Sequence, residues 1–395
     1  MKNYAHTKES VQKITLNLLA YCQNEGWAGW DPYDALNSRL FRLLPFLDQR
    51  IPRLILIQSM KRSPINLRRM MLVPKTQNPK ALALFLSSLI KIRKMGLAQN
   101  ITIKSLIEQI KELRSPDTPY WCWGYSFPWQ TRTLLVPRGA PNLVCTTFVA
   151  NALLDAYQDS ADPACFEMAQ SAAAYILNEL YWTQGNSVAC FCYPTPSARS
   201  RVHNANFLGA ALLCRIYQHN KDDALLDAAL RVCRYSVSKQ EDDGSWYYGE
   251  HSSQQWIDNF HTGYNLCALA DIGQFSETRE FEVCLRRGFD FYQRNFFTPE
   301  GEPQYFHNRI YPIDIHSAAQ SIITLLRFES MEETAKSKAY AVLRWVCRHM
   351  LDHHDFFYYQ KTPYYMNKIP YIRWSQAWIL YALSIFLEQS HEPSS

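Results

Sequence analysis

A pair of helical segments recurs along this sequence at a nearly constant interval, and this repeat limits the possible folds more than any single motif does. Five apolar segments follow short openings of small or polar residues, and their equivalent positions are Phe148, Asn206, Gly263, Ser317 and Gln376. Successive positions are 58, 57, 54 and 59 residues apart. A nearly constant period of this length indicates repeated supersecondary units that stack on one another.

Four segments that carry more charge alternate with the apolar ones. They are Asp162–Leu180, Asp222–Ser238, Glu277–Phe297 and Met331–Leu351. Their apolar residues return every three to four positions, as in a helix with one buried face. The apolar segments are hydrophobic nearly all round, which is typical of helices enclosed on both sides. This alternation predicts an all-α fold, an α/α toroid with an inner and an outer ring of helices.

The repeat extends toward the N-terminus. The predicted outer elements are Val11–Cys22, Leu54–Met60 and Ile101–Leu113, and the predicted inner helices are Tyr33–Leu44 and Pro79–Ile92. The toroid is therefore expected to have six or seven hairpins. Because no linker rich in Gly, Ser or Pro interrupts the series, residues 1–395 are predicted to form a single domain. Strands are expected only in connectors such as Val188–Tyr193.

Connectors that lead from an outer to an inner helix are long and aromatic, for example residues 119–132 and 355–374. The opposite connectors are short, for example Gln218–Asp222. The long connectors must therefore gather at one end of the toroid, over the N-termini of the inner helices. These termini present free N–H groups and the positive end of the helix dipole. The functional site is predicted at this end.

The composition narrows the class of protein. With 47% hydrophobic and 14% aromatic residues, a disordered chain is excluded. The eleven cysteines have no repeated spacing, so we expect buried free thiols in a reducing compartment. Cys190 and Cys192 have no second Cys/His pair to complete a zinc site, and no metal is predicted. Neither a GxGxxG nor a P-loop sequence occurs, so no cofactor is predicted.

Targeting signals are not apparent in the sequence. The N-terminal residues 1–13 have no apolar signal core, and no run of 18 apolar residues occurs. We therefore expect a cytoplasmic protein, with a possible peripheral position at the inner membrane.

Residues 49–107 contain twelve basic residues and no acid. Since the whole chain has a net charge of +5, the rest of the chain carries −7. A segment of this kind produces a positive field that suits anionic glycans, phosphates or an anionic membrane surface. The alternative is that these charges are a solvated helical face. No nucleic acid is expected as a partner.

Two carboxylates occupy equivalent places before consecutive inner helices. Asp258 stands in WIDNFHTG and Asp314 in YPIDIHSA, and each is followed by a histidine, His261 or His316. Glycoside hydrolysis needs one acid and one base or nucleophile, and a pair of carboxylates across the mouth of the toroid would supply both. The alternative for each is a helix N-cap, which Asp also favours. Further candidate carboxylates are Glu250, Asp243 and Asp31.

A second set of residues favours a different reaction. Arg199, Arg201, His203, Asn204 and Asn206 precede an inner helix. With His261 and a tyrosine such as Tyr264 or Tyr311, they could neutralise a uronate carboxylate and remove the proton next to it, as a polysaccharide lyase or C5-epimerase must do. The alternative is that His203 and Asn204 only cap the helix.

Aromatic residues of the long connectors complete the predicted site. Tyr and Trp mixed with Asn, Gln, Arg and His suit the C–H faces and hydroxyls of a sugar, although part of these aromatics must also pack the hairpin ends. The predicted catalytic residues are Asp258, Asp314, His261 and His203. The predicted substrate-binding residues are Trp123, Arg132, Asn204, Asn206, Trp246, Glu250, Trp256, Tyr264, His316 and Trp374.

Two resemblances accompany these residues. Gln240–Trp246, QEDDGSW, resembles the Q-x-x-DGSW element of terpene cyclases and protein prenyltransferases, which are α/α toroids. In those families the element ties hairpins together, so the resemblance implies a structural clasp. The DxDD motif of squalene–hopene cyclases and the zinc-ligand set of prenyltransferase β subunits are not found, so those chemistries are not implied.

Six motifs resemble a bacterial exopolysaccharide- and capsule-biosynthesis family that is similar to six-hairpin glycosidases. They are DPYDALNS (Asp31–Ser38), KRSPINLR (Lys61–Arg68), NPKALALFLS (Asn78–Ser87), WGYSFPWQTR (Trp123–Arg132), VHNANFLGAALL (Val202–Leu213) and WIDNFHTGYNL (Trp256–Leu266). The resemblance implies a role in polysaccharide assembly and leaves the reaction open.

Together these features predict a carbohydrate-active protein of bacterial surface polysaccharide biosynthesis. A glycoside hydrolase with paired carboxylates is the leading hypothesis. A uronate lyase or C5-epimerase is the first alternative, and a non-catalytic glycan-binding or scaffold protein is the second. The expected partner is an anionic polysaccharide or a lipid-linked oligosaccharide.

Overall fold

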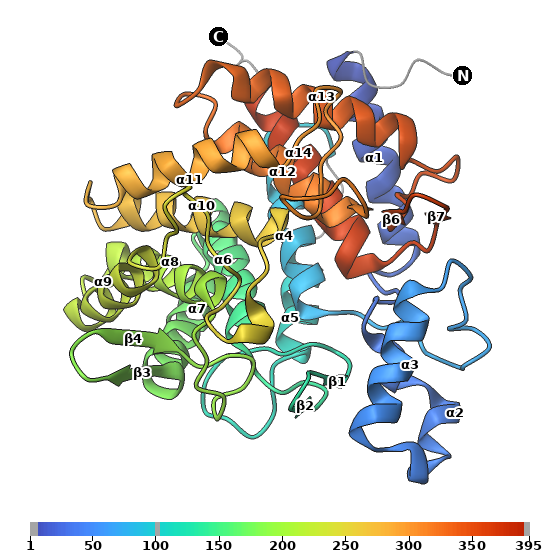
Figure 1. Cartoon of the computed structure of the whole chain (residues 1–395), viewed down its shortest axis with the longest axis horizontal. Coiled ribbons are helices and arrows are strands. Elements are labelled where there is room, and N and C mark those ends of the chain that lie inside the picture. Colours follow the sequence, from blue (N-terminus) through green and yellow to red (C-terminus); the bar gives the residue numbers. More distant parts are fainter. Residues whose placement is uncertain (1–6, 99–102, 391–395) are drawn as a thin grey trace.

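The computed structural model describes residues 7–98 and 103–390 and forms an α/α toroid (Figure 1). Six inner helices in the described part of the chain build a closed ring, in which each contacts the next and the last contacts the first. They are α4 (Pro79–Lys94), α6 (Leu143–Ser160), α8 (His203–Asn220), α10 (Asn259–Phe275), α12 (Ile315–Arg327) and α14 (Ala377–Gln389). The predicted fold class is confirmed.

An outer helix covers each inner helix. The outer helices are α1 (Lys8–Asn24), α5 (Ile103–Glu112), α7 (Pro163–Tyr175), α9 (Asp223–Val237), α11 (Glu282–Asn295) and α13 (Glu333–His349). Five of them follow their inner partner in the chain, whereas α1 packs against α14 and so joins the two ends of the chain. Lys8 Nζ donates a hydrogen bond to the carbonyl of Ser390 at 2.8 Å along this seam. The described residues therefore form six hairpins.

Burial follows the two periodicities in the sequence. In α4 every residue from Pro79 to Ile90 is buried, because this inner helix has neighbours on all sides. In α9 the buried residues return every three to four positions, from Leu225 through Val232 to Ser236, and the other face meets solvent. Side chains of Asn78, Asn142, Asp258 and Asp314 accept hydrogen bonds from backbone N–H groups at the starts of four inner helices.

The prediction of an inner helix at Tyr33–Leu44 is wrong. This range holds the single turn η1 (Asp34–Asn37) and the short helix α2 (Arg39–Arg42). Ser38 separates them, because its hydroxyl accepts from the N–H of Phe41 as an N-cap and donates to the carbonyl of Met71 at 2.6 Å. The turn η2 (Pro45–Leu47) follows, and the predicted outer element Leu54–Met60 lies within α3 (Arg50–Arg62). Residues 101–102 of predicted helix Ile101–Leu113 lie outside the described residues.

Short antiparallel strands occur in the long connectors, as expected. The strand β1 (Trp129–Gln130) pairs with β2 (Leu135–Val136), and β3 (Tyr181–Gln184) pairs with β4 (Val188–Phe191). A third sheet has the order β5 (Ile313–Asp314), β6 (Gln360–Lys361) and β7 (Met366–Asn367). Two π-helical turns adjoin ring helices: η3 (Ile176–Leu180) follows α7 and η5 (Ile372–Gln376) precedes α14, while the turn η4 (Ser252–Gln254) lies in the connector before α10.

Gln240–Trp246 forms the predicted clasp between hairpins. Gln240 Nε2 donates to the carbonyl of Gly244 and to that of Cys284 in α11, each at 2.9 Å. Trp246 is buried and its indole N–H bonds the carbonyl of Ser236 at the end of α9. These contacts fix the connector of one hairpin against the outer helix of the next.

Two composition-based expectations concern the helices and the cysteines. None of the described helices combines the length and hydropathy that crossing a membrane requires. The eleven cysteines are free thiols, and all except the half-buried Cys267 are buried.

Replacing Gly244 by alanine is expected to destabilise the fold through the clasp. Gly244 has φ +95°, and an added Cβ would lie 2.3 Å from the carbonyl oxygen of Arg287. Gly185→Ala is the matched control, since Gly185 has φ +59° but open space around it. Both variants carry the cost of a left-handed conformation, about 1 kcal/mol. In urea unfolding, Gly244→Ala should lose clearly more free energy of unfolding than Gly185→Ala, and equal losses would contradict the clasp.

Candidate active site

A cavity of about 520 Å³ opens at the end of the toroid where the inner helices begin. Its size lies within the range of small-ligand sites. Twelve of its twenty-one lining residues are aromatic. The inner helices contribute residues near their N-termini, among them Lys80, Asn204, His261 and His316, and the long connectors contribute most of the rest. This cavity therefore lies at the predicted end of the toroid.

Asp258 and His261 form a hydrogen-bonded pair in this cavity. Asp258 is the N-cap of α10, and its Oδ1 accepts from the backbone N–H of His261 at 3.0 Å. Its Oδ2 lies 2.7 Å from His261 Nδ1 and 2.9 Å from the indole nitrogen of Trp256. The carboxylate favours the tautomer with the proton on Nδ1, in which Nε2 carries the lone pair. His261 is 20% exposed, whereas the Asp258 side chain is 1% exposed.

His316 and Tyr264 form a second pair at the inner wall. His316 Nε2 lies 2.5 Å from the hydroxyl of Tyr264, and its Nδ1 is buried without a partner in the described residues. The ring is stacked between Phe260 and Trp378, at centroid distances of 4.5 and 4.4 Å. Burial, with the charges of Lys80 and Arg373, holds the pKa of His316 well below its usual value. His316 is therefore neutral, and its hydrogen bond positions the hydroxyl of Tyr264.

Lys80 is a buried amine without a counter-ion. It stands in the first turn of α4, and no ion pair or side-chain hydrogen bond joins its ammonium to another described residue. The Nζ atom lies 4.1 Å from the ring centroid of Phe148, 5.3 Å from that of Tyr264 and 5.1 Å from that of Trp378. Burial, followed by the charge of Arg373, holds the pKa of Lys80 well below its usual value. An anionic ligand would supply the missing negative charge.

Arg373 is the second buried basic residue of the cavity. Asp31 binds it through two hydrogen bonds, from Nε at 2.6 Å and from Nη2 at 2.9 Å. The guanidinium also lies 4.8 Å from the ring centroid of Tyr125. Asp31, a reserve candidate for catalysis, therefore orients Arg373 and does not line the cavity.

Basic side chains outnumber carboxylates in the lining of the cavity. Lys61 and Arg309 also line it, and Lys61 Nζ donates to the hydroxyl of Tyr33 at 2.5 Å. Among the described lining residues, Asp258 is the single carboxylate beside four basic side chains. This balance favours an anionic ligand.

Asp314 does not face Asp258 across the mouth, and this prediction is corrected. The Asp314 side chain is fully buried and is not part of the cavity lining. It caps α12, and it accepts from the indole nitrogen of Trp374 at 3.0 Å and from Gln360 Nε2 at 3.2 Å. Burial raises its pKa to about 6. The N-cap role, which the sequence left open, is the one that the structure supports.

Four other predicted site residues lie behind the cavity wall. His203 is buried, its Nδ1 is 3.3 Å from Ser236 Oγ, and burial lowers its pKa to about 4. Asn206 bonds the N–H of Phe191 and the hydroxyl of Ser236. The indole nitrogens of Trp123 and Trp246 bond backbone carbonyls of α5 and α9. These side chains hold hairpin ends together because their polar atoms are used inside the fold.

The remaining predicted residues lie at the cavity or beside it. Asn204, Trp256, Tyr264, His316 and Trp374 line the cavity, and the side-chain oxygen of Asn204 is buried without a partner. Arg132 and Glu250 line an adjoining groove of about 730 Å³. Trp129, Tyr193, Tyr248 and Trp256 line both hollows. The two hollows therefore adjoin each other, with aromatic side chains between them.

Lys80, Arg373, Lys61 and Arg309 were missed as site residues by the sequence analysis. Lys80 was assigned to a basic segment, although it is the single charged residue in the first twelve positions of α4. A lone charge at the start of an apolar inner helix was the available signal. Arg373 could have been found in a similar way, because it directly precedes Trp374, where the last apolar segment of the repeat begins.

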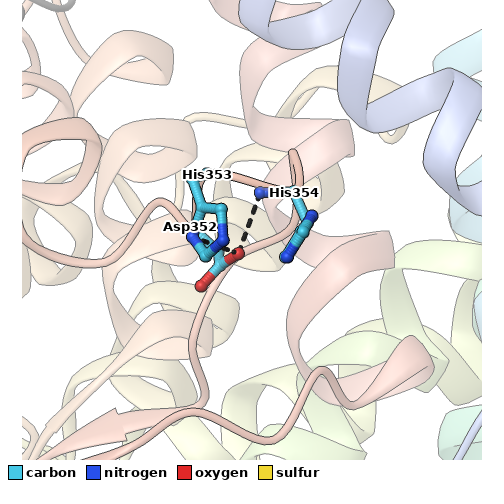
Figure 2. Close-up of side chains that lie close together, drawn as sticks. All are labelled: Asp352, His353 and His354. Atoms are coloured by element: carbon cyan, nitrogen blue, oxygen red, sulfur yellow. Dashed lines mark hydrogen bonds and ion pairs between the residues drawn. The ribbon is translucent and has the colours of Figure 1, made fainter.

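Asp352, His353 and His354 form the one group of potential metal ligands found in the described residues (Figure 2). It lies in the loop after α13, and none of its members lines the cavity. Asp352 Oδ1 accepts from the main-chain N–H of His354 at 2.8 Å, and Oδ2 accepts from the hydroxyl of Tyr358 at 2.8 Å. These hydrogen bonds give the carboxylate a role in shaping the loop.

Comparison with known proteins supports the fold class. A structure of a GH76 α-mannanase from Bacteroides thetaiotaomicron superposes with a TM-score of 0.60 at 12% identity, over 79% of this chain and 85% of that chain. A sugar epimerase from a ruminal bacterium has a TM-score of 0.58 at 10% identity, over 80% and 89% of the two chains.

An unsaturated glucuronyl hydrolase specific for heparin has a TM-score of 0.56 at 12% identity, over 80% of this chain and 88% of that chain. The sequence itself matches no family model and no curated protein. At these identities the likeness establishes a shared six-hairpin, glycosidase-like fold.

Asp314→Asn is expected to change how stability depends on pH. An unfolded carboxyl ionises near pH 4, and folded Asp314 ionises near 6. Between these values the folded protein binds more protons than the unfolded one, so Asp314 makes stability fall as pH rises. Relative to the wild type, the variant should gain about 3 kcal/mol in free energy of unfolding between pH 4 and pH 6. Parallel urea curves at several pH values test this, and a constant difference would contradict it.

Proposed function

We propose that this protein is an enzyme that acts on an anionic glycan by proton transfer at the carbon next to a uronate carboxyl group. Removal of this proton leads either to β-elimination, as in a lyase, or to C5 epimerisation. The observation that carries the proposal is the content of the cavity: one carboxylate bound to a histidine, and four basic side chains. A hydrolase needs two carboxyl groups on either side of the scissile bond, and the cavity lining offers one.

His261 is the proposed base. Its Nδ1 is bound to Asp258 at 2.7 Å, which leaves Nε2 free to accept a proton. The arrangement has the logic of the Asp–His pair of hydrolytic triads, where the carboxylate fixes the tautomer and stabilises the imidazolium that forms.

Tyr264 is the proposed proton donor on the other side of the sugar. Its ring centroid lies 6.0 Å from that of His261, and its hydroxyl is bound to neutral His316. In elimination the proton leaves C5 for His261, the C4–O bond breaks, and the departing oxygen takes a proton from Tyr264. In epimerisation Tyr264 returns a proton to C5 from the opposite face. Both outcomes use the same two groups.

The cations provide the second requirement of this chemistry. A proton next to a carboxylate becomes acidic only when the negative charge that develops on the carboxyl oxygens is stabilised. Lys80 has no counter-ion among the described residues, and Arg373 has one face occupied by Asp31. These two side chains are the proposed carboxylate-binding groups.

The groove beside the cavity supports an oligosaccharide or polysaccharide as the substrate. Tyr248 and Trp256 stack at a centroid distance of 4.5 Å where the two hollows meet, and such aromatic faces suit sugar rings. Arg132, Arg199 and Arg201 line the groove and would attract further acidic sugars. The resemblance to polysaccharide-biosynthesis proteins and the likeness to carbohydrate-active enzymes of the same fold support a role in polysaccharide assembly.

Incubation with uronate-containing polysaccharides in deuterated water, followed by NMR, tests the reaction. A new C4=C5 double bond, with C5 left without hydrogen or deuterium, identifies a lyase, and deuterium at C5 with inverted configuration identifies an epimerase. Cleavage that forms no C4=C5 double bond and leaves the original proton on C5 identifies a hydrolase and overturns the proposal. Saturable binding with an unchanged glycan identifies a binding protein and also overturns it.

His261→Ala is expected to slow loss of the C5 proton by about 10²- to 10⁴-fold, the range that a positioned general base contributes. The measurement is formation of the C4=C5 double bond for a lyase, or deuterium incorporation at C5 for an epimerase. Binding of the glycan should change little, because His261 acts in the proton transfer. His353→Ala is the matched control, since His353 is exposed and lies outside the cavity. A His261→Ala variant with the wild-type exchange rate would mean that another group is the base.

Lys80→Met is expected to raise the stability of the fold and to weaken the binding of an anionic glycan. Removal of a buried amine that has no hydrogen-bond partner or counter-ion should raise the free energy of unfolding, because methionine fills similar volume without desolvation cost. Affinity for a uronate oligosaccharide should fall by about tenfold or more, while affinity for its neutral, carboxyl-reduced counterpart should not. Lys94→Met on the same helix is the control, since Lys94 is exposed. Calorimetry and urea unfolding provide the two measurements.

A further inference from the structure

The connector between α1 and α4 exposes an unusual amount of apolar surface. Of the fifteen large hydrophobic side chains that are exposed in the described part of the chain, nine lie between residues 40 and 72. They are Leu40, Leu43, Leu44, Phe46, Ile51, Ile55, Ile65, Met70 and Leu72. We call residues 39–72 the apolar–basic protrusion. Clusters of this kind on a folded domain mark interaction sites.

The exposed residues follow the helices of the protrusion. On α3, Ile51 and Ile55 are four positions apart and share one exposed face, while Ile57 and Met60 are buried on the other. Leu43 and Phe46 follow α2 and are 74% and 69% exposed. Figure 1 shows α2 and α3 at the edge of the molecule, beside the strands β1 and β2. The exposed apolar side chains therefore belong to elements at the edge of the molecule.

The same surface is positively charged. Arg39, Arg50, Arg62 and Arg69 are exposed, and none of them forms an ion pair with a described residue. The single acid between residues 39 and 72 is Asp48, which is bound to Arg53 at 2.7 Å. Of the other cations of the basic segment 49–107, Arg68 is buried against Asp34, Lys80 lies in the cavity, and Lys75, Lys91 and Arg93 form ion pairs. Lys94 and Lys104 are exposed on other elements, whereas Arg50, Arg62 and Arg69 lie where the apolar side chains are exposed.

The protrusion adjoins the mouth of the cavity. Lys61, near the end of α3, lines the cavity together with Tyr33. Arg53 of α3 bonds Gln130 in β1 at 3.3 Å, and the hydroxyl of Tyr365 bonds the carbonyl of Arg62 at 2.8 Å. A surface bound by the protrusion would therefore lie next to the entrance of the site.

We propose that the apolar–basic protrusion docks the protein onto an anionic lipid membrane. Exposed leucine, isoleucine and phenylalanine enter the boundary between headgroups and acyl chains, and the unpaired arginines bind anionic headgroups. Neutral apolar surface alone would suit a second copy of the chain equally well, but four unpaired arginines and one acid make two such faces repel each other. The inference stands apart from the proposed reaction, because docking needs no catalysis. It places the cavity beside glycans that are anchored in the membrane.

Co-sedimentation with vesicles tests the docking. The full chain should bind vesicles of phosphatidylcholine and phosphatidylglycerol, bind pure phosphatidylcholine much more weakly, and lose binding as salt is raised. A triple variant, Arg39→Gln, Arg50→Gln and Arg62→Gln, should bind the anionic vesicles about a hundredfold more weakly, at about 1 kcal/mol for each arginine. A second triple variant, Leu43→Ser, Phe46→Ser and Ile51→Ser, should also lose most of the binding.

Matched controls come from other helices. Arg286→Gln, Arg344→Gln and Arg348→Gln remove three exposed arginines of α11 and α13, and Val283→Ser removes an exposed apolar side chain of α11. These variants should bind as the wild type does. All substituted side chains are exposed, so the fold is expected to persist, and circular dichroism checks it.

Three results would overturn the proposal. The wild type could fail to bind anionic vesicles, or the control arginines could matter as much as those of the protrusion. Sedimentation velocity without lipid could also show a dimer that the Leu43, Phe46 and Ile51 variant abolishes, and the protrusion would then be an interface between two copies. None of these results bears on the exchange reaction at C5, so docking and catalysis can fail independently.

Discussion

Closure of the inner ring is the constraint on which the rest of this structure depends. Each inner helix is buried on all sides only if the sixth meets the first, and the contacts between α14 and α4 complete the circle. Ion pairs such as Lys91–Glu388 at 2.6 Å and Arg215–Asp155 at 2.7 Å join neighbouring inner helices in the ring. The closed ring brings the N-termini of six helices to one end. The cavity at that end follows from the ring and not from any one loop.

The sequence predicted what depends on periodicity. Inner and outer helices, their order and the end that carries the site all follow from apolar patterns and connector lengths. Tyr33–Leu44 was misread because its apolar residues resemble an inner helix, while Ser38 and Pro45 divide it into short turns. The N-cap at Ser38 thus determined the local structure of this range more than its apolar pattern did.

The candidate site was predictable only in part, because burial is decided by distant residues. Asp258 and Asp314 have equivalent contexts in the sequence, yet one lines the cavity and the other lies behind Trp374, sixty positions further along the chain. Lys80 was missed for the same reason. Its charge suggested a position at the surface, but aromatic rings from α6, α10 and α14 enclose it. The chemistry of the cavity therefore arises from tertiary contacts that no single segment encodes.

The position of α14 after the other ring helices also has a consequence for synthesis of the chain. Five inner helices leave the ribosome before it, and until then their ring lacks one wall. Arg373 and Trp374, which immediately precede α14, reach the cavity only when this wall is added. Lys80 and His316 are then enclosed at the same time, since Trp378 of α14 packs against both. A nascent or truncated chain without α14 therefore has neither a closed core nor a complete site, and completion of the fold and acquisition of the chemistry are one event.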